Sequence, residues 1–475
     1  MAAPDTIPDA TQDSGSGTGT DTIAAISTPP GRGGIGIVRL SGLEAASIAA
    51  QLVRLRQPLE HGRARLADVL DGMDNDAVGR SDSARIDEAL VTLFAAPNSY
   101  TAEDVVEIAA HGSPVVLELL LRRAMDLGAR LAEPGEFTER AFLAGRIDLT
   151  QAEAVRDLIE AQTMTQARQA AGQMGGALSR RVGPLKHSLV ELIALLEAGI
   201  DFAEDDVDVA AKGEIARRIG ELTPPLRALE VSFARGRIVH DGLTLAIVGR
   251  PNAGKSSLFN RLVQRERAIV TATPGTTRDL VTERISLDGI PLELVDTAGL
   301  REGLEEAELL GIARSREALA DAALVLVVLD ATQPLNDEEQ RLLEAVRGRP
   351  ALVVVNKCDL TEPEEAAEAV GGVPALRTSA LTGTGIAELR ERILALATGG
   401  AASEPGMLTS LRHHQAITTA LAALGDAAQA NAGGIPHEMI LLDLYRGLWA
   451  LDSLTGQTTS DDILNLIFSM FCIGK

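Results

Sequence analysis

The chain has few cysteines and no long apolar segment. Two cysteines among 475 residues cannot build a disulfide framework. No run approaches the roughly 18 consecutive apolar residues that a membrane-spanning helix needs. The start lacks a basic region followed by an apolar one, so the sequence predicts no secretory signal. We therefore expect a cytoplasmic protein with no membrane partner.

Basic residues are also in short supply, with 44 Lys and Arg against 67 Asp and Glu and a net charge of −23. A global positive field therefore cannot hold a nucleic acid, and a basic partner protein is favoured. Residues 1–21 are rich in Asp, Ser, Gly, Thr and Pro. Such a segment buries too little apolar surface to offset its ordering entropy, so it is predicted to be a disordered tail.

Length and periodicity predict about three domains. Residues 35–40 and 88–94 have strand character, residues 114–127 have helical spacing, and the apolar period becomes 3.6 beyond Leu149. Helical stretches on both sides of an α/β segment predict that this segment is inserted into one helical domain. The predicted boundaries are 1–21 for the tail, 22–146 for an N-terminal domain, 147–241 and 399–475 for two parts of a helical domain, and 242–398 for the α/β domain.

A phosphate-binding loop, residues 249–256 (GRPNAGKS), directly follows the apolar run from Leu243 to Val248. Its glycines allow backbone N–H groups to wrap phosphate oxygens. Lys255 can neutralise the outer phosphates, and the Ser256 hydroxyl can bind Mg²⁺.

Three later loops make the nucleotide a guanine nucleotide. Residues 296–299 (DTAG) end the apolar run 292–295, and residues 356–359 (NKCD) end the run 351–355. The Asp359 carboxylate can accept hydrogen bonds from two N–H donors that adenine does not present, and residues 379–381 (SAL) supply a fourth loop. Loops at the carboxyl ends of strands are where an open α/β sheet binds ligands. The predicted GTP contacts are Asn252, Ala253, Gly254, Lys255, Ser256, Ser257, Thr271, Ala272, Thr273, Pro274, Gly275, Thr276, Thr277, Asp296, Thr297, Ala298, Gly299, Asn356, Lys357, Asp359, Ser379, Ala380 and Leu381.

Leu300 stands where Ras-like enzymes carry the glutamine that positions the attacking water. An apolar side chain cannot do this. Either hydrolysis is slow, or a polar residue further along takes the role. The candidates are Glu302, Glu305, Glu306 and Glu308, each of which can also be a solvated surface charge.

Three other motifs are ambiguous. Residues 31–36 (GRGGIG) match a dinucleotide fingerprint in form, but prolines precede them and a strand follows, so a tight glycine-rich turn is favoured. Residues 472–475 (CIGK) imitate a prenylation box, but Gly474 is not aliphatic. Cys472 is either a buried hydrophobic cysteine or a working thiol. His413 and His414 are predicted to be a surface pair on a helix.

Long strings at both ends of the chain resemble the tRNA-modification GTPase family MnmE, also called TrmE. The resemblance extends over nearly the whole chain. The matching strings are 29–34 (PPGRGG), 38–42 (VRLSG), 99–107 (SYTAEDVVE), 134–142 (PGEFTERAF), 148–154 (DLTQAEA) and 467–475 (IFSMFCIGK), of which Met470 is not part of the match.

This resemblance implies a multidomain α/β and α fold: an N-terminal α+β folate-binding domain that dimerises, and a helical domain interrupted by a Ras-like P-loop GTPase domain. It implies a homodimer that works with the flavin-dependent partner MnmG on tRNA. Together the two proteins would add an aminomethyl-type group (carboxymethylaminomethyl) at carbon 5 of the wobble uridine.

The resemblance also assigns roles to residues. Arg39, Glu107, Arg146 and Lys475 would bind a 5-formyltetrahydrofolate-type cofactor, with Arg146 standing where the family has Lys. Glu308 would orient the attacking water, and Cys472 would act in the modification. The implied metal ligands are Ser256 and Thr277 for Mg²⁺, and Asn252, Thr271, Thr273 and Thr276 for K⁺, which would do the work of an arginine finger.

Two rival functions follow from the same residues. A regulatory GTPase switch in ribosome assembly would share the nucleotide loops, but it would need an RNA-binding appendage with a basic face. A self-sufficient folate-dependent one-carbon transferase would leave the GTPase loops without a purpose, although these loops are intact.

Overall fold

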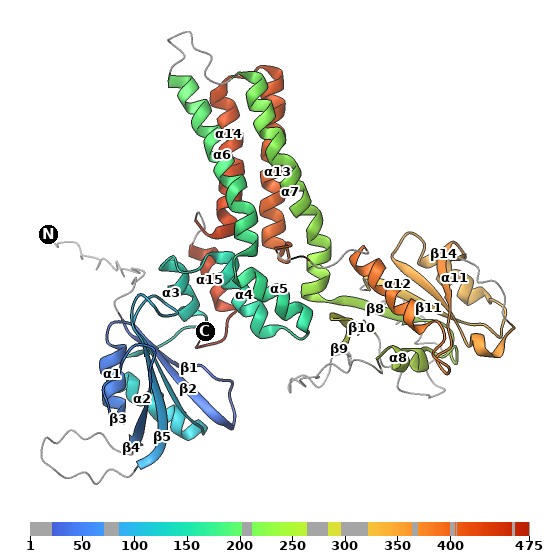
Figure 1. Cartoon of the computed structure of the whole chain (residues 1–475). Coiled ribbons are helices and arrows are strands. Elements are labelled where there is room, and N and C mark those ends of the chain that lie inside the picture. Colours follow the sequence, from blue (N-terminus) through green and yellow to red (C-terminus); the bar gives the residue numbers. More distant parts are fainter. Residues whose placement is uncertain are drawn as a thin grey trace, which may run out of the picture. The chain divides into compact units, whose positions relative to one another are not determined.

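The computed structural model describes residues 21–70, 85–201, 211–263, 284–295, 322–362, 369–399, 404, 406–457 and 461–474. The chain divides into two compact units (Figure 1). Unit 1 comprises residues 1–152 and 459–475, and unit 2 comprises residues 153–458. Among the described residues, no helix combines the length and apolar character needed to cross a membrane.

Unit 1 is built on a seven-stranded sheet whose strand order is β3-β4-β5-β6-β2-β1-β7. Alternate residues of its strands, such as Val38 and Leu40 of β2, are fully buried and pack with two helices, α1 and α2. The strands are β1 (Ile23–Ile26), β2 (Gly33–Ser41), β3 (Val53–Leu55), β4 (Ala64–Leu70), β5 (Arg85–Phe94), β6 (Val105–Gly112) and β7 (Arg130–Leu131), and the helices are α1 (Ala45–Leu52) and α2 (Pro114–Asp126).

The end of the chain packs against the start of α3 (Glu136–Leu143) in unit 1. Phe468 of α15 (Asp461–Ser469) is buried, and a β-bridge joins Pro134 to Ile473. Residues 459–475, which the sequence assigned to the second part of the helical domain, are part of compact unit 1 in the structure. Their aromatic side chains supply apolar surface that α3 needs to bury.

The first part of unit 2 is helical. Leucines at helical spacing, including Leu189, Leu192 and Leu196, form one core in which α14 packs against α6 and α13 packs against α7 (Figure 1). The helices are α4 (Leu149–Glu160), which starts in unit 1, α5 (Met164–Met174), α6 (Ala177–Asp201), α7 (Lys212–Asp241), α13 (Leu411–Gly433) and α14 (His437–Thr455).

The second part of unit 2 is a mainly parallel sheet of order β13-β14-β12-β11-β8-β10-β9. The strands predicted to precede the nucleotide loops are confirmed as β8, β10 and β12. Asp288 and Gly289, with φ values of 47° and 85°, form the turn between β9 and β10. The strands are β8 (Leu243–Val248), β9 (Arg284–Leu287), β10 (Ile290–Val295), β11 (Leu324–Asp330), β12 (Ala351–Asn356), β13 (Ala369–Val370) and β14 (Val373–Arg377), and the helices are α8 (Lys255–Val263), α11 (Asp337–Ala345), the 3₁₀ helix η2 (Cys358–Leu360) and α12 (Ile386–Thr398).

Two local predictions need correction. The glycine-rich segment 31–36 is a turn only at its start, because Gly31 has a φ of 125° but β2 already begins at Gly33. His413 is not on the surface. It is 1% exposed, because it faces a carboxylate of α4, while the ring of the half-buried His414 stacks on Phe233.

We predict opposite effects of alanine at two glycines of α7. A Cβ at Gly236 would lie 2.0 Å from the carbonyl oxygen of Leu408, whereas a Cβ at Gly220 meets nothing within 4 Å. Gly236→Ala should therefore destabilise the fold by roughly 1–3 kcal/mol through overpacking. Gly220→Ala should stabilise it by up to about 1 kcal/mol through helix propensity. Chemical denaturation of both variants measures the difference, and equal effects would contradict the close approach.

Candidate functional site

The phosphate-binding loop joins β8 to α8 at the carboxyl edge of the unit 2 sheet. Gly249 and Gly254 have φ values of 146° and 92°, which L side chains rarely adopt. A Cβ at Gly249 would lie 2.2 Å from the carbonyl oxygen of Val328 on the neighbouring strand. The two glycines are therefore required by backbone conformation and, at Gly249, by close approach.

Lys255 is the first residue of α8, where helix N–H groups can receive an anion. Its Nζ donates to the carbonyl oxygens of Gly249, at 2.7 Å, and of Arg250, at 2.9 Å. The ammonium group is thus held over the loop that would surround the phosphates.

Asn356, at the end of β12, ties the base-recognition loop to the phosphate loop. Its Nδ2 donates to the carbonyl oxygen of Ala253 at 3.0 Å, and its Oδ1 accepts from the backbone N–H of Ala380 at 3.1 Å. Because the Asn356 side chain is buried, these two bonds fix three of the four predicted loops relative to one another. Asp359, in η2, is exposed.

Lys357 adopts a left-handed conformation with a φ of 65°. Its Nζ donates to the Asp330 carboxylate at 2.7 Å. Burial raises the pKa of Asp330, but the Lys357 ion pair and the bonds from Thr332 outweigh burial and lower that pKa to about 2. The carboxylate that anchors the guanine loop is therefore charged throughout the physiological range.

Several predicted site residues lie outside the described residues. They are Thr271, Ala272, Thr273, Pro274, Gly275, Thr276, Thr277, Asp296, Thr297, Ala298, Gly299, Glu308 and Lys475. The described residues bring together the phosphate loop, residues 356–359 and residues 379–381 through the two bonds of Asn356.

Unit 1 holds a second candidate site around Arg39 of β2. Arg39 donates to the Glu107 carboxylate from Nε at 3.0 Å and from Nη2 at 2.7 Å. Its Nη1 donates to the carbonyl oxygen of Gly474 at 3.3 Å, and its guanidinium lies 5.6 Å from the centre of the Phe137 ring. The structure thus joins two predicted folate ligands to the C-terminal motif.

Two further residues of this predicted site are exposed. Arg146 follows α3, and its backbone N–H donates to the carbonyl oxygen of Ala141 at 2.9 Å. Cys472 is exposed, although Phe468 and Phe471 beside it are buried. The alternative that Cys472 is a buried hydrophobic residue is therefore wrong, and the thiol is accessible to a reaction partner.

Comparisons with known proteins agree with this arrangement. The model of the MnmE helical domain matches residues 149–472, and that of the GTP-binding protein TrmE N-terminus matches residues 22–146. The tRNA modification GTPase MnmE of Koribacter versatilis (strain Ellin345) is 57% identical over 460 residues, which cover 96% of this chain and 99% of that protein. This chain belongs to the MnmE family.

Other relatives include the tRNA modification GTPase MnmE of Symbiobacterium thermophilum, which is 43% identical over 461 residues, or 96% of this chain and 100% of that protein. Among solved structures, the G domain of the FeoB iron transporter of T. maritima is 28% identical. It covers 33% of this chain and 98% of that domain, with a TM-score of 0.25.

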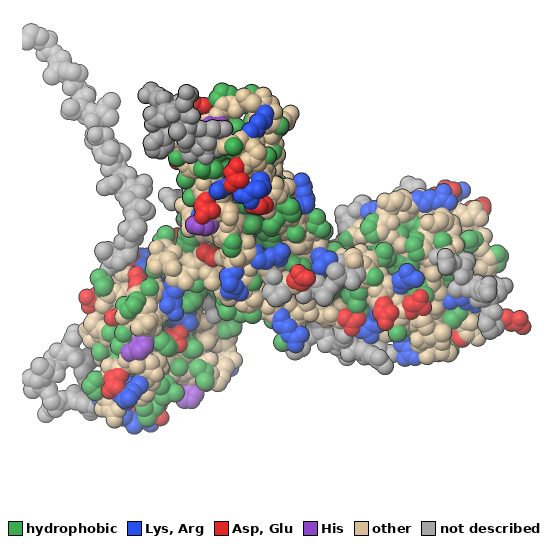
Figure 2. All heavy atoms as spheres, turned by 45° about the horizontal axis from the view of Figure 1, so that its top comes forward, with side chains coloured by type: hydrophobic (Ala, Val, Ile, Leu, Met, Phe, Trp, Pro, Cys, Tyr) green, Lys and Arg blue, Asp and Glu red, His purple; other side chains and the backbone are tan. Residues whose placement is uncertain are grey.

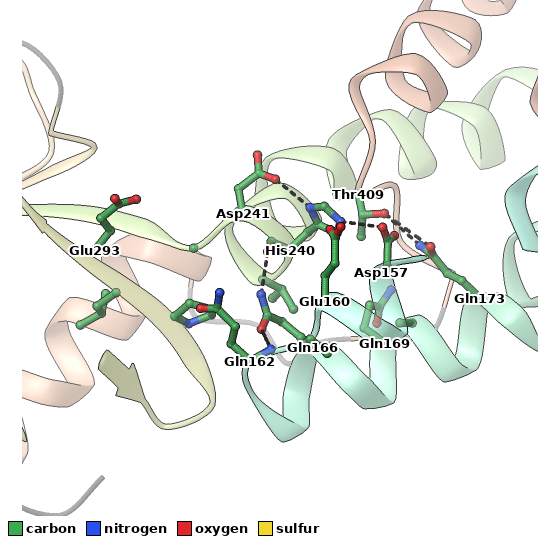
Figure 3. A pocket seen from close by; sticks show the side chains of 16 residues that line it. Asp157, Glu160, Gln162, Gln166, Gln169, Gln173, His240, Asp241, Glu293 and Thr409 are labelled. Atoms are coloured by element: carbon green, nitrogen blue, oxygen red, sulfur yellow. Dashed lines mark hydrogen bonds and ion pairs between the residues drawn. The ribbon is translucent and has the colours of Figure 1, made fainter. Parts of the chain in front are cut away.

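Sequence reasoning missed a polar pocket of about 180 Å³ in unit 2 (Figure 3). His240, near the end of α7, lies between Asp157 of α4, at 3.2 Å from Nε2, and Asp241, at 2.7 Å from Nδ1. Gln166 of α5 donates from Nε2 to the His240 carbonyl oxygen at 2.7 Å. Gly242 then leads directly into β8, so these contacts fix the point at which the chain enters the nucleotide-binding sheet.

A second missed cluster is the buried ion pair of Glu153. Arg412 donates to both oxygens of this carboxylate, at 2.8 and 2.9 Å, and His413 Nε2 lies 2.6 Å from Oε2. Burial raises the pKa of Glu153, but His413 and Arg412 lower it to about 2. A sequence signal existed in Arg412 and His413, but nothing in the sequence indicated the partner.

The ion pair with Asp157 should be visible in the titration of His240. The contact between His240 and Asp157 raises the pKa of His240 to about 9, although burial alone would lower this pKa. Asp241 adds a smaller rise. Because the folded-state pKa is raised, the pair stabilises the fold fully below about pH 6.5, and this stability is lost as the pH rises through about 9. NMR titration of the His240 ring should give a pKa near 9.

In Asp157→Asn the pKa of His240 should fall toward 6.5 but stay above it, because Asp241 still raises it. Asp241→Asn is the matched control and should lower the pKa less. A pKa that stays near 9 without Asp157 would show that another group holds the proton.

Proposed function

We propose that this chain hydrolyses GTP and uses the cycle to modify tRNA. Together with the flavin-dependent partner MnmG it would add a carboxymethylaminomethyl-type group at carbon 5 of the wobble uridine. The observation that carries the GTP part is Asn356, which ties the guanine loop to the phosphate loop. The tRNA part is supported by the relatives named tRNA modification GTPase MnmE.

The residues of the nucleotide site fit GTP. The cradle at Gly249 and Gly254 has no room for side chains, since a Cβ at Gly254 would lie 2.3 Å from Asn356 Nδ2. Lys255 would neutralise the β and γ phosphates, and Asp359 would accept from the guanine edge. Ser256 and Thr277 would hold Mg²⁺. Asn252, Thr271, Thr273 and Thr276 would hold a K⁺ ion that supplies positive charge near the phosphates.

Glu308 would orient the attacking water, because Leu300 cannot. Two G domains facing each other in a homodimer would complete the site.

The α/β segment would be an insertion into one helical domain. The packing of α7, which precedes this segment in the chain, against α13, which follows it, supports this arrangement. We place the protein in the cytoplasm.

The residues around Arg39 fit a folate of the 5-formyltetrahydrofolate type. The guanidinium and the Glu107 carboxylate offer the donors and acceptors that a pterin amide edge requires, and Phe137 adds an aromatic face. Arg146 and Lys475 would add cationic contacts. When bound, the folate would supply one-carbon chemistry, and the Arg39 bond to Gly474 would keep the Cys472 thiol near it.

The guanine specificity is tested by Asp359→Asn. Exchanging a carboxylate for an amide replaces one acceptor by a donor, so preference should move from GTP toward xanthosine triphosphate. Without the charge-assisted bonds, GTP affinity should fall by roughly tenfold or more. Competition binding with GTP, ATP and xanthosine triphosphate measures this change.

Asp337→Asn, on the first turn of α11, is the matched control because it removes one carboxylate outside the predicted base loop. It should leave the nucleotide preference unchanged. Equal binding of ATP and GTP by the unaltered chain would contradict the guanine site itself.

The role of the terminal thiol is tested by Cys472→Ser. The residue belongs to none of the nucleotide loops, so GTP turnover should stay near normal while wobble-uridine modification disappears. The change is nearly isosteric and the side chain is exposed, so stability should also remain unchanged. Nucleoside analysis of tRNA, GTP hydrolysis and thermal unfolding give the three readouts.

Cys358→Ser is the control, since this half-buried cysteine lies in the guanine loop. If Cys358→Ser keeps normal GTP turnover, it should also keep normal wobble-uridine modification. Normal levels of modified tRNA in Cys472→Ser would end the functional claim for this thiol.

A further inference from the structure

Five arginines of this acidic chain lie close together at the edge of the unit 1 sheet. We call this group the arginine edge, and it consists of Arg54, Arg56, Arg63, Arg65 and Arg85, on or next to β3, β4 and β5. On the face of the molecule that Figure 2 shows, basic and acidic side chains are interspersed. Any polyanion that this chain binds must therefore use a local feature of this kind.

Acidic neighbours only partly neutralise the arginine edge. Asp68 accepts from Arg56 at 3.1 Å and from Arg85 at 3.4 Å, and Glu88 lies 2.9 Å from Arg56. Glu60 similarly pairs with Arg63 and Arg65. These three carboxylates are thus shared among four guanidinium groups. Exposed ion pairs contribute little to stability, so a phosphate can replace a carboxylate at small cost.

The strand register places Arg54 of the arginine edge on the same face of the sheet as Arg39, whereas Arg65, one residue after Ala64, is on the opposite face. Directly paired residues share a face, and the pairs Arg39↔Glu107, Glu107↔Thr92 and Thr92↔Ala64 lead across the sheet to β4. Asp68 lies four residues after Ala64 and pairs with Arg54 on β3. Because side chains alternate, positions 64, 68 and 54 all share the face of Arg39.

The spacing between the two features suits a nucleic acid. Four strand intervals of about 4.8 Å separate β3 from β2, or roughly 19 Å across the sheet. This distance is comparable with the width of an RNA duplex. A stem held at the sheet edge by its phosphates could therefore present a neighbouring loop base to Arg39, Glu107 and the C-terminal motif.

We propose that the arginine edge binds phosphates of the tRNA anticodon stem and thereby delivers the wobble base to the site around Arg39. The proposal rests on the proposed function, which makes tRNA the substrate. Arginine is suited to this role because its planar fork binds phosphate oxygens in pairs. Phosphate contacts of this kind fix position and orientation without reading sequence.

The test removes three arginines whose side chains are at least half exposed: Arg56→Gln, Arg63→Gln and Arg85→Gln in one full-length chain. The probe is an unmodified tRNA transcript with uridine at the wobble position. Affinity at about 0.1 M salt should fall by tenfold or more. The slope of log affinity against log salt should fall by about 0.9 for each phosphate that the variant no longer neutralises.

The matched control removes three equally exposed arginines of α7: Arg217→Gln, Arg227→Gln and Arg237→Gln. These also pair with carboxylates of their own helix, and the net charge changes by the same amount. The control should keep its tRNA affinity and salt slope. If both triple variants lose affinity equally, the effect is one of net charge and the proposal is wrong.

A single substitution that should strengthen tRNA binding makes the test independent of folding damage. Asp68→Asn releases Arg56 and Arg85 from their shared carboxylate, so tRNA should bind more tightly and with a steeper salt dependence. A purely structural role for these ion pairs predicts weaker binding instead, which would overturn the proposal.

GTP hydrolysis without tRNA and folate binding should be unchanged in all three proteins, because the altered residues contact neither site. If the unaltered chain binds the transcript and the edge variant binds it equally well, the proposal fails while the proposed function stands. If the unaltered chain does not bind the transcript, both fail.

Discussion

The return of the chain's last residues to its first sheet unit is the constraint on which the rest of the architecture depends. Phe468 and Phe471 are buried, and a Cβ on Gly135 would lie 2.6 Å from the carbonyl oxygen of Phe468. This close approach is possible only for a glycine, which also adopts the φ of 74° that starts α3. Residues 153–458 form one long excursion that leaves unit 1 before the chain comes back to it. The Cys472 motif is placed beside Arg39 as a result.

Within unit 2, buried charges join the outgoing and returning parts of that excursion. Glu153 comes before the nucleotide-binding sheet in the chain, and its partners Arg412 and His413 come after it. A buried carboxylate without partners is costly because it has lost its hydration. A packing in which α13 does not contact α4 would leave Glu153 in that state and is therefore disfavoured. The close contact of Gly236 with Leu408 adds a steric condition at the same junction. We interpret these contacts as selecting one alignment of the helices, on top of the apolar packing that holds them together.

Much of the fold and part of the candidate site could be predicted from local sequence. The runs at β8 and β12 are almost entirely apolar because both faces of a parallel sheet are covered, and the loops after them are recognisable from their own residues. His413 shows where such reasoning fails. A histidine pair at the start of a helix is compatible with a surface, and only the carboxylate of α4 made the buried position favourable. The C-terminal segment has a helical period, but periodicity does not say which surface an apolar face will cover, and in the structure residues 459–475 cluster with unit 1.

The sequence by itself determined the phosphate loop, the guanine loop, the helical period and the family, because each depends on the backbone preferences and chemistry of a contiguous stretch. Only the tertiary structure decided which distant groups meet. The bond from Asn356 to Ala253 joins residues 103 positions apart, and that from Arg39 to Gly474 joins residues 435 positions apart. Strand register likewise put Arg54 and Arg39 on one face of a sheet. Such contacts depend on how whole elements pack and align, and no local pattern in the sequence encodes that alignment.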